Sequence, residues 1–294
     1  MRPPRWRITA VANGFHGAFS HSAGPMSYRP LSTTSPFYSR SHSHSHEPAT
    51  AHLSPRWLSD LKSRIGRCLQ FGCSSEQVHE AGLILKELTT SWRELVAGSE
   101  GFLTDESRRE TFRQNVVWGE QDAMGHVNNV MYVRYAESAR ILWFQNFANR
   151  IDRANRKQWE DLWSPRSYGL ILKSIKVDYK FPMEFPDKIT VFHKLRSSPD
   201  ATTESFILDV IILSELHRRP AARCFEDLLV YDYKNGKKVA LPPFIVENFK
   251  ETFRLQEEAK EKNGKRVREL IERVGRLEKG SWDRADAKED MGSA

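Results

Sequence analysis

The chain has 294 residues, enough for one domain with long extensions or for two ordinary domains. A hydrophobic content of 39% can fill a core, and the mean hydropathy of −0.59 indicates long polar segments outside it. The net charge of +7 is unevenly placed, because residues 1–46 hold five arginines and no acidic residue. The remainder carries 40 basic against 38 acidic residues, or +2, and a body so nearly neutral excludes general nucleic-acid binding.

Residues 1–50 have the composition of a mitochondrial transit peptide followed by a disordered linker, since they bear arginine, are rich in serine and lack acidic residues before Glu47. Apolar residues recur on one face of a helix in the first part: Ile8, Val11, Ala12, Phe15 and Phe19. We therefore expect delivery to the mitochondrial matrix. The alternative is a disordered tail with no targeting role. The alternating Ser-His run at 41–46 is interpreted as a low-complexity linker and not as a metal site.

Residues 51–108 are predicted to form a helical extension. Ser54-Pro55 is typical of a helix start, with serine at the cap, and Ser74-Ser75 indicates a second start. From Glu76 to Ala97 apolar residues recur at intervals of three and four, and Gly98 supplies a stop. Two short helices hardly bury a core of their own, so we expect them to cover the main domain or to bridge subunits.

Two classes of protein are disfavoured by the same sequence. No apolar run approaches the roughly 18 residues that cross a bilayer, so no transmembrane segment is expected. Cys68, Cys73 and Cys224 show neither a disulfide framework nor Cys-x-x-Cys metal spacing, which is typical of a reducing compartment.

Residues 109–245 are predicted to form the main domain. Alternation of apolar and polar residues from Phe112 to Trp118 predicts a strand, and a helix follows from Val130 to about Phe147. Apolar residues occur all round that helix, as expected where a sheet wraps it. Further strands are predicted at 175–181, 189–195, 205–214 and 222–233, with a hairpin at Asn235-Gly236. This order of elements gives an α+β fold.

Two segments flank these elements. Residues 149–168 form an insertion after the helix, which we interpret as a possible lid. The C-terminal part, 246–294, carries twelve basic and twelve acidic residues between Glu247 and Asp290. Mixed charges at helical spacing predict a solvated, ion-paired helix, and a partner-binding coiled coil is the alternative.

The connection at 117–129 holds the candidate chemistry. Asp122 and His126 lie four residues apart in a turn, and Asn128 and Asn129 favour the cap of the helix that follows. A helix start offers unpaired backbone N–H groups that stabilise an oxygen which becomes negative during a reaction. A nearby carboxylate acts as a base or nucleophile. The alternatives are that Asp122 is only a turn residue and that His126 only hydrogen-bonds the turn.

Residues 118–140 resemble the thioesterase branch of the hotdog-fold superfamily, which includes hydroxybenzoyl-CoA and acyl-ACP thioesterases. The likeness rests on Asp122, on His126-Val127-Asn128-Asn129 and on the tyrosine-bearing segment 130–140. It implies a single hotdog domain, in which an antiparallel sheet wraps a long central helix. It also implies catalysis by Asp122 and His126 with the backbone amide of Asn129, and substrate contacts from Gly125, Asn128 and Tyr132. For Tyr132 a core role is the alternative.

We therefore expect a mitochondrial thioesterase that releases an acid and free CoA, or a free carrier, from acyl-CoA or acyl-carrier substrates without a metal or cofactor. The resemblance also implies a homodimer or homotetramer with the acyl groove between subunits. The main alternative is a catalytically silent hotdog scaffold or assembly protein whose helical extensions are the working surfaces. A hotdog hydratase or dehydratase is less well matched, because its Asp and His are spaced differently.

Overall fold

The computed structural model describes residues 53–54, 56–165, 167–284 and 286–287. The expectations for the transit peptide, its amphipathic helix and the Ser-His run all concern residues outside the described ones. Within the described part, no helix is both long enough and apolar enough to cross a membrane.

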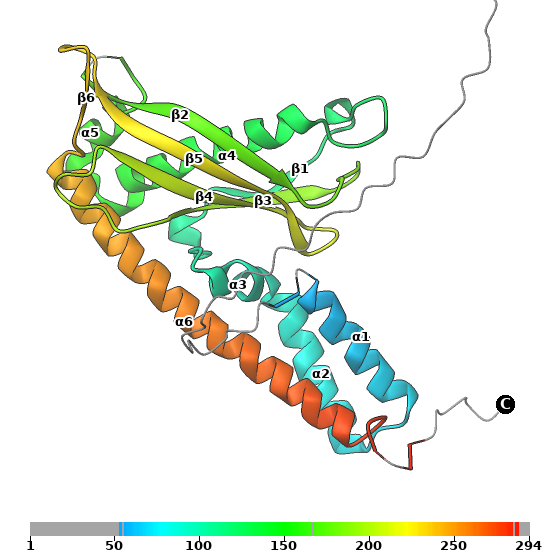
Figure 1. The fold of residues 1–294 in the computed structure, drawn as a ribbon. Coiled ribbons are helices and arrows are strands. Elements are labelled where there is room, and N and C mark those ends of the chain that lie inside the picture. The colour runs from blue at the N-terminus through cyan, green and yellow to red at the C-terminus, as the bar shows by residue number, and fades with distance from the viewer. Residues whose placement is uncertain (1–52, 55, 166, 285, 288–294) are drawn as a thin grey trace, which may run out of the picture. The chain divides into compact units, whose positions relative to one another are not determined.

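One antiparallel sheet, in the strand order β1-β3-β4-β5-β2, forms the centre of the described region, and β6 pairs with β5 (Figure 1). Its strands are β1 Thr111–Asn115, β2 Tyr168–Tyr179, β3 Lys188–Leu195, β4 Ser205–Ser214, β5 Arg219–Asp232 and β6 Lys237–Val239. β4 and β5 carry many β-branched and apolar residues, which suit a pleated surface that is covered on both faces. The first strand is shorter than predicted, because Trp118–Glu120 forms a 3-10 turn.

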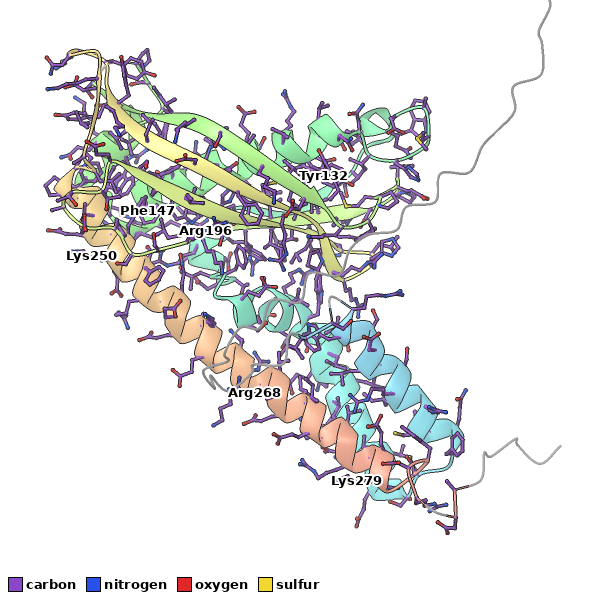
Figure 2. All side chains as sticks on the ribbon, viewed as in Figure 1. Tyr132, Phe147, Arg196, Lys250, Arg268 and Lys279 are labelled. Carbon is purple, nitrogen blue, oxygen red and sulfur yellow. The ribbon has the colours of Figure 1, made fainter. Side chains whose placement is uncertain are left out.

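Helix α4, Asn129–Asn146, lies along one face of this sheet. Its small residues Ala136 and Ala139 are fully buried, so the helix axis approaches the strands closely. The sheet contributes the facing layer of small and branched residues: Val191, Val210, Ile212, Ala222 and Cys224. In Figure 2, Tyr132 and Phe147 mark the two ends of this packed region. The single hotdog arrangement that the sequence implied is therefore confirmed.

An aromatic cluster closes the far end of α4. Trp159, from α5 Arg156–Asp161, is fully buried and stacks on Phe147 with ring centroids 4.6 Å apart. Its indole N–H donates to Asp152 at 3.0 Å, and Phe249 of the last helix completes the cluster. The insertion at 149–168 is thus anchored in the core, which argues against the lid that its sequence suggested.

The opposite face of the sheet is covered by helices. These are α1 Trp57–Gln70, α2 Ser75–Thr90, α3 Trp92–Val96 and the long α6 Pro243–Lys279. Phe192, Ile211 and Leu213 point to this side and are at most 1% exposed within the cluster that α1, α2, α3 and α6 form with the sheet. Figure 1 shows α1 and α2 beside the C-terminal half of α6. The N-terminal helical pair and the charged C-terminal helix are both confirmed.

The helical extension differs from its sequence prediction at two boundaries. The cap of α1 is Arg56 and not Ser54, whose hydroxyl accepts the Arg56 amide at 3.2 Å. The helix predicted from 76 to 97 breaks at Ser91, because Thr89 and Thr90 turn their hydroxyls back onto carbonyls of the preceding turn. The start at Ser74 is confirmed, with a full capping box to Gln77.

Candidate active site

The first turn of α4 leaves one backbone amide free. Asn128 caps the helix, since its Oδ1 accepts the Val130 amide at 3.1 Å and its carbonyl accepts the Met131 amide at 2.9 Å. The Asn129 amide has no acceptor among the described residues, and the Asn129 side chain is exposed. The helix start therefore presents the Asn129 amide as an unpaired donor, at the positive end of the helix dipole.

Asp122 organises the turn that precedes this helix. Its Oδ1 accepts the amide of Met124 at 2.8 Å and that of His126 at 3.3 Å. Its own amide donates to the His126 carbonyl at 2.8 Å. Gly125 adopts a φ of +78°, a left-handed conformation that favours glycine. The role of Gly125 is thus to close the turn, and nothing in the structure tests the substrate contact expected of it.

The second oxygen of Asp122 is available for chemistry. The residue is exposed, and its Oδ2 has no hydrogen-bond partner among the described residues. One oxygen is thus fixed by two amides while the other faces outward. This arrangement holds the carboxylate in one orientation and leaves Oδ2 able to react.

His126 faces a different carboxylate from the one expected. Its Nε2 lies 3.7 Å from Glu184 Oε1, and its side chain is 33% exposed. Only its backbone meets the Asp122 side chain. The structure therefore brings His126 and Asp122 into one turn but does not pair the imidazole with the Asp122 carboxylate.

Glu120 fixes the turn to the body of α4, a role that sequence reasoning missed. Its Oε2 accepts both the Tyr135 hydroxyl and the Val117 amide at 2.8 Å, and its carbonyl accepts the Asn128 amide at 2.8 Å. Burial, and then the bond to Glu120, raise the pKa of Tyr135, so its hydroxyl stays protonated and donates. No local motif marks this pair, because fifteen residues separate its members.

Tyr132 lies in the core beneath the turn. It is 2% exposed, and its hydroxyl accepts the Met183 amide at 3.3 Å. Its ring meets Tyr179 edge-on with centroids 5.2 Å apart, and the Tyr179 hydroxyl donates to the Asn129 carbonyl at 3.2 Å. This position favours the core interpretation of Tyr132 over contact with a substrate.

A buried charged cluster lies deeper, between α4 and the sheet. Arg140 Nη1 contacts Glu226 Oε1 at 2.5 Å, and the other Glu226 oxygen lies 3.6 Å from His193 Nε2. Glu110 completes the group, with Oε1 4.0 Å from His193 Nδ1. The partner of Arg140 thus comes from a strand 86 residues later in the chain.

The chain matches one family model, described as the thioesterase-like superfamily, over residues 116–249. This segment contains the turn, α4 and strands β2 to β6. Residues 116–249, called the thioesterase-like domain below, are similar to this superfamily. The segment is slightly less than half of the chain, and the helical extension lies outside it.

Several solved structures are similar to about half of the chain. A putative thioesterase from Pseudomonas aeruginosa is 21% identical, with 47% of this chain and 96% of that chain covered and a TM-score of 0.38. A Thermus thermophilus thioesterase, solved with coenzyme A and zinc, is 21% identical, with 51% and 97% covered and a TM-score of 0.39. A 1,4-dihydroxy-2-naphthoyl-CoA thioesterase from Synechocystis is 16% identical, with 45% and 89% covered and a TM-score of 0.36. No curated protein matches the chain.

Proposed function

We propose that the thioesterase-like domain hydrolyses acyl-CoA or acyl-carrier thioesters, with Asp122 as base or nucleophile and the Asn129 amide as oxyanion donor. The observation that carries the proposal is the free Asn129 amide at the start of α4, next to a turn that fixes one Asp122 oxygen and leaves the other open. A preorganised backbone donor aimed at developing negative charge is worth several kcal/mol in acyl transfer, roughly 3–4.

Each group has a defined step in the water-mediated route. Asp122 takes a proton from water, and the resulting hydroxide attacks the thioester carbonyl carbon. The carbonyl oxygen becomes negative and accepts a hydrogen bond from the Asn129 amide. Collapse of this intermediate breaks the carbon–sulfur bond, and the leaving thiolate takes the proton from Asp122. In the covalent route, the free Asp122 oxygen attacks the carbonyl carbon, and the carbon–sulfur bond breaks to release the thiolate and leave an anhydride on Asp122. Water then hydrolyses the anhydride, which releases the acid and restores the Asp122 carboxylate, and the thiolate takes a proton from that water.

His126 has a supporting place in this proposal. Its backbone amide donates to Asp122 Oδ1 and helps to orient the carboxylate, while its imidazole faces Glu184. A side-chain substitution at His126 should keep this hydrogen bond. Asn128 acts through the cap that leaves the Asn129 amide free, and Gly125 acts through the turn.

We further propose that the site is completed by a second copy of the chain in a homodimer or homotetramer. Asp122 and the surrounding apolar residues Met124 and Val130 are exposed, the latter two at 79% and 66%. The 12-residue strand β2 pairs with β5 along one edge only, among the described residues. An edge of this length with unpaired backbone groups is suited to cover by another chain.

Delivery to the mitochondrial matrix also remains a proposal. It is supported by the five arginines and the absence of acidic residues in 1–46. Fusion of residues 1–50 to a fluorescent protein tests it, and diffuse cytosolic fluorescence would count against it.

The enzymatic proposal is tested by thiol release from a panel of acyl-CoA substrates. Asp122→Asn should reduce the rate about 100-fold or more, as expected when a general base is lost. Asp200→Asn is the matched control, because Asp200 Oδ1 accepts the Thr202 amide at 2.8 Å in an exposed turn of the same kind. Equal rates for wild type and Asp122→Asn would remove Asp122 from the mechanism.

A scaffold function is the second candidate, favoured by the helices outside the domain, which are α1, α2, α3 and most of α6. Absence of thiol release across acyl-CoA and acyl-carrier substrates, from a correctly folded oligomer, would favour it.

A further inference from the structure

A cavity of about 750 Å³ lies where the thioesterase-like domain meets the helical extension. The helical extension contributes Thr89, Trp92 and Arg93. The other side is formed by Arg113, residues 115–118 and 185–188, and Glu215, Leu216 and Arg218. Its volume lies within the range of ligand cavities. None of the proposed hydrolytic steps uses it.

Cationic side chains are in excess around this cavity. Four cations and two carboxylates line it: Arg93, Arg113, Lys188 and Arg218, with Asp187 and Glu215. Glu215 is ion-paired with Arg93, whose Nε donates to Glu215 Oε1 at 2.8 Å. Glu215 Oε2 also lies 3.9 Å from Arg113 Nε. Asp187 accepts from the Ser214 hydroxyl at 2.5 Å. Within the described part of the chain, neither Lys188 nor Arg218 has a carboxylate at ion-pair distance, so positive charge is available to a ligand.

Two of these cations are held on strained backbone. Arg113, with φ of 53°, and Arg218, with φ of 51°, are the non-glycine residues with positive φ among the described residues, and both line this cavity. Arg113 lies at the irregular register of β1, and Arg218 lies in the turn between β4 and β5. A bulge re-aims a side chain, and left-handed backbone at a residue other than glycine clusters at functional sites.

Exposed aromatic rings lie beside the cations. Trp118 is 75% exposed and Phe185 is 46% exposed, and both line the cavity. An open indole next to unpaired cations is suited to a ligand that has a planar ring and phosphate groups.

The cavity shares two chain segments with the candidate active site. Trp118 precedes Asp122 by four residues, which span at most about 14 Å. Phe185 follows Glu184, whose carboxylate lies 3.7 Å from His126 Nε2. These two segments place the cavity near the candidate active site.

We propose that this cavity binds the phosphorylated adenosine end of coenzyme A, with Arg113, Lys188 and Arg218 on the phosphates and Trp118 against the adenine. The assignment rests on the proposed function in that the nucleotide is the carrier of the thioester. It gives the helical extension a direct role, because α2 and α3 supply one wall of the cavity.

The test is calorimetric titration of the full chain with adenosine 3′,5′-bisphosphate and with CoA. Arg113→Asn and Arg218→Asn each remove a cation, and asparagine tolerates left-handed backbone, so neither substitution adds strain. Each should weaken binding about tenfold, the loss expected for a charge-assisted hydrogen bond, without lowering the melting temperature. Trp118→Ala should weaken binding about fivefold, and Trp118→Phe should restore it.

Arg134→Gln is the matched control, because Arg134 is an exposed arginine of α4 outside the cavity. It should leave the affinity unchanged. Weaker binding for Arg134→Gln, with unchanged binding for the two cavity variants, would overturn the proposal by placing the nucleotide along α4. Binding of pyrophosphate as tight as that of the nucleotide, or no nucleotide binding, would overturn it too.

Failure of the two proposals can be told apart. Asp122→Asn should bind adenosine 3′,5′-bisphosphate as the wild type does. If no acyl-CoA releases thiol but the cavity variants still lose nucleotide affinity, the cavity assignment stands and the hydrolase proposal falls. If thiol release depends on Asp122 while the cavity variants bind and turn over normally, the cavity assignment falls alone.

Discussion

At the scale of single residues, Gly125 has the clearest conformational requirement in the turn. Its φ is +78°, and an added Cβ would meet no atom within 4 Å. Gly125→Ala should therefore destabilise the protein through backbone strain alone, by about 1 kcal/mol. Gly119→Ala is the control, since Gly119 also has open space around it and needs no positive φ. Urea denaturation of the two variants should separate them, and equal midpoints would contradict this account of the turn.

Glu110 should make stability depend on pH. Its side chain is 1% exposed, and burial raises its pKa well above the usual range. In the unfolded chain a glutamate ionises near pH 4.3, whereas folded Glu110 keeps its proton to higher pH. The folded state then binds the extra proton, so stability falls as pH rises between the two pKa values.

Glu110→Gln should remove this loss of folding stability at higher pH. The variant should gain stability relative to the wild type as the pH is raised from about 4 to 8. The measurement is the urea midpoint at each pH, with the exposed neighbour Glu106→Gln as the control. Parallel pH curves for wild type and Glu110→Gln would show that Glu110 ionises normally in the folded state.

The residues that the sequence predicted make contacts close by in the chain, whereas the residues that it missed make contacts with distant segments. Asp122, Gly125 and Asn128 act within a few positions of themselves, so a turn and a cap were predictable from the sequence. The Tyr135–Glu120 bond spans 15 residues, and the Arg140–Glu226 pair spans 86. Such partners are determined by how segments that are distant in the sequence pack together, which no local pattern specifies.

At the scale of elements, α4 and β5 are joined by the Arg140–Glu226 pair. Burial alone raises the pKa of Glu226, but His193 and Arg140 outweigh it and hold that pKa below its usual value. The charged form of Glu226 is thus kept inside the core. Replacing Arg140 by methionine should destabilise the protein by roughly 3–5 kcal/mol, because an uncompensated carboxylate remains buried.

The double variant Arg140→Met with Glu226→Leu should lose less stability than Arg140→Met alone, because both charges are gone. Chemical denaturation of the two single variants and the double variant measures the coupling. Additive losses would show that the pair makes no net interaction.

Element types were more predictable than element boundaries. The alternation in β3, β4 and β5 and the cap at Ser74 follow from side chains that act locally. The buried position of Trp159 depends on how the sheet and α6 meet that segment. The mixed charges of α6 concealed an apolar stripe, Val267, Leu270, Val274 and Leu277, which faces α1 and α2.

At the scale of the whole described region, the charged helix holds the extension onto the domain. Arg273 contacts Glu80 at 2.7 Å and Arg266 contacts Glu87 at 3.0 Å, so α6 is ion-paired to α2 along the stripe. Partly exposed pairs of this kind contribute little each, and the apolar stripe supplies most of the stabilisation.

Removal of the extension should therefore expose the outer face of the sheet. Phe192, Ile211 and Leu213 are at most 1% exposed beneath α1, α2, α3 and α6, and together their burial is worth roughly 5 kcal/mol or more. A chain of residues 109–294 should melt lower than one of residues 51–294 and should aggregate on heating, as scanning calorimetry and light scattering would show. Ile211→Lys should reduce the aggregation of the shorter chain and should destabilise the longer one. If the shorter chain is equally stable and remains monodisperse, the extension is only docked to the domain and is no part of its core.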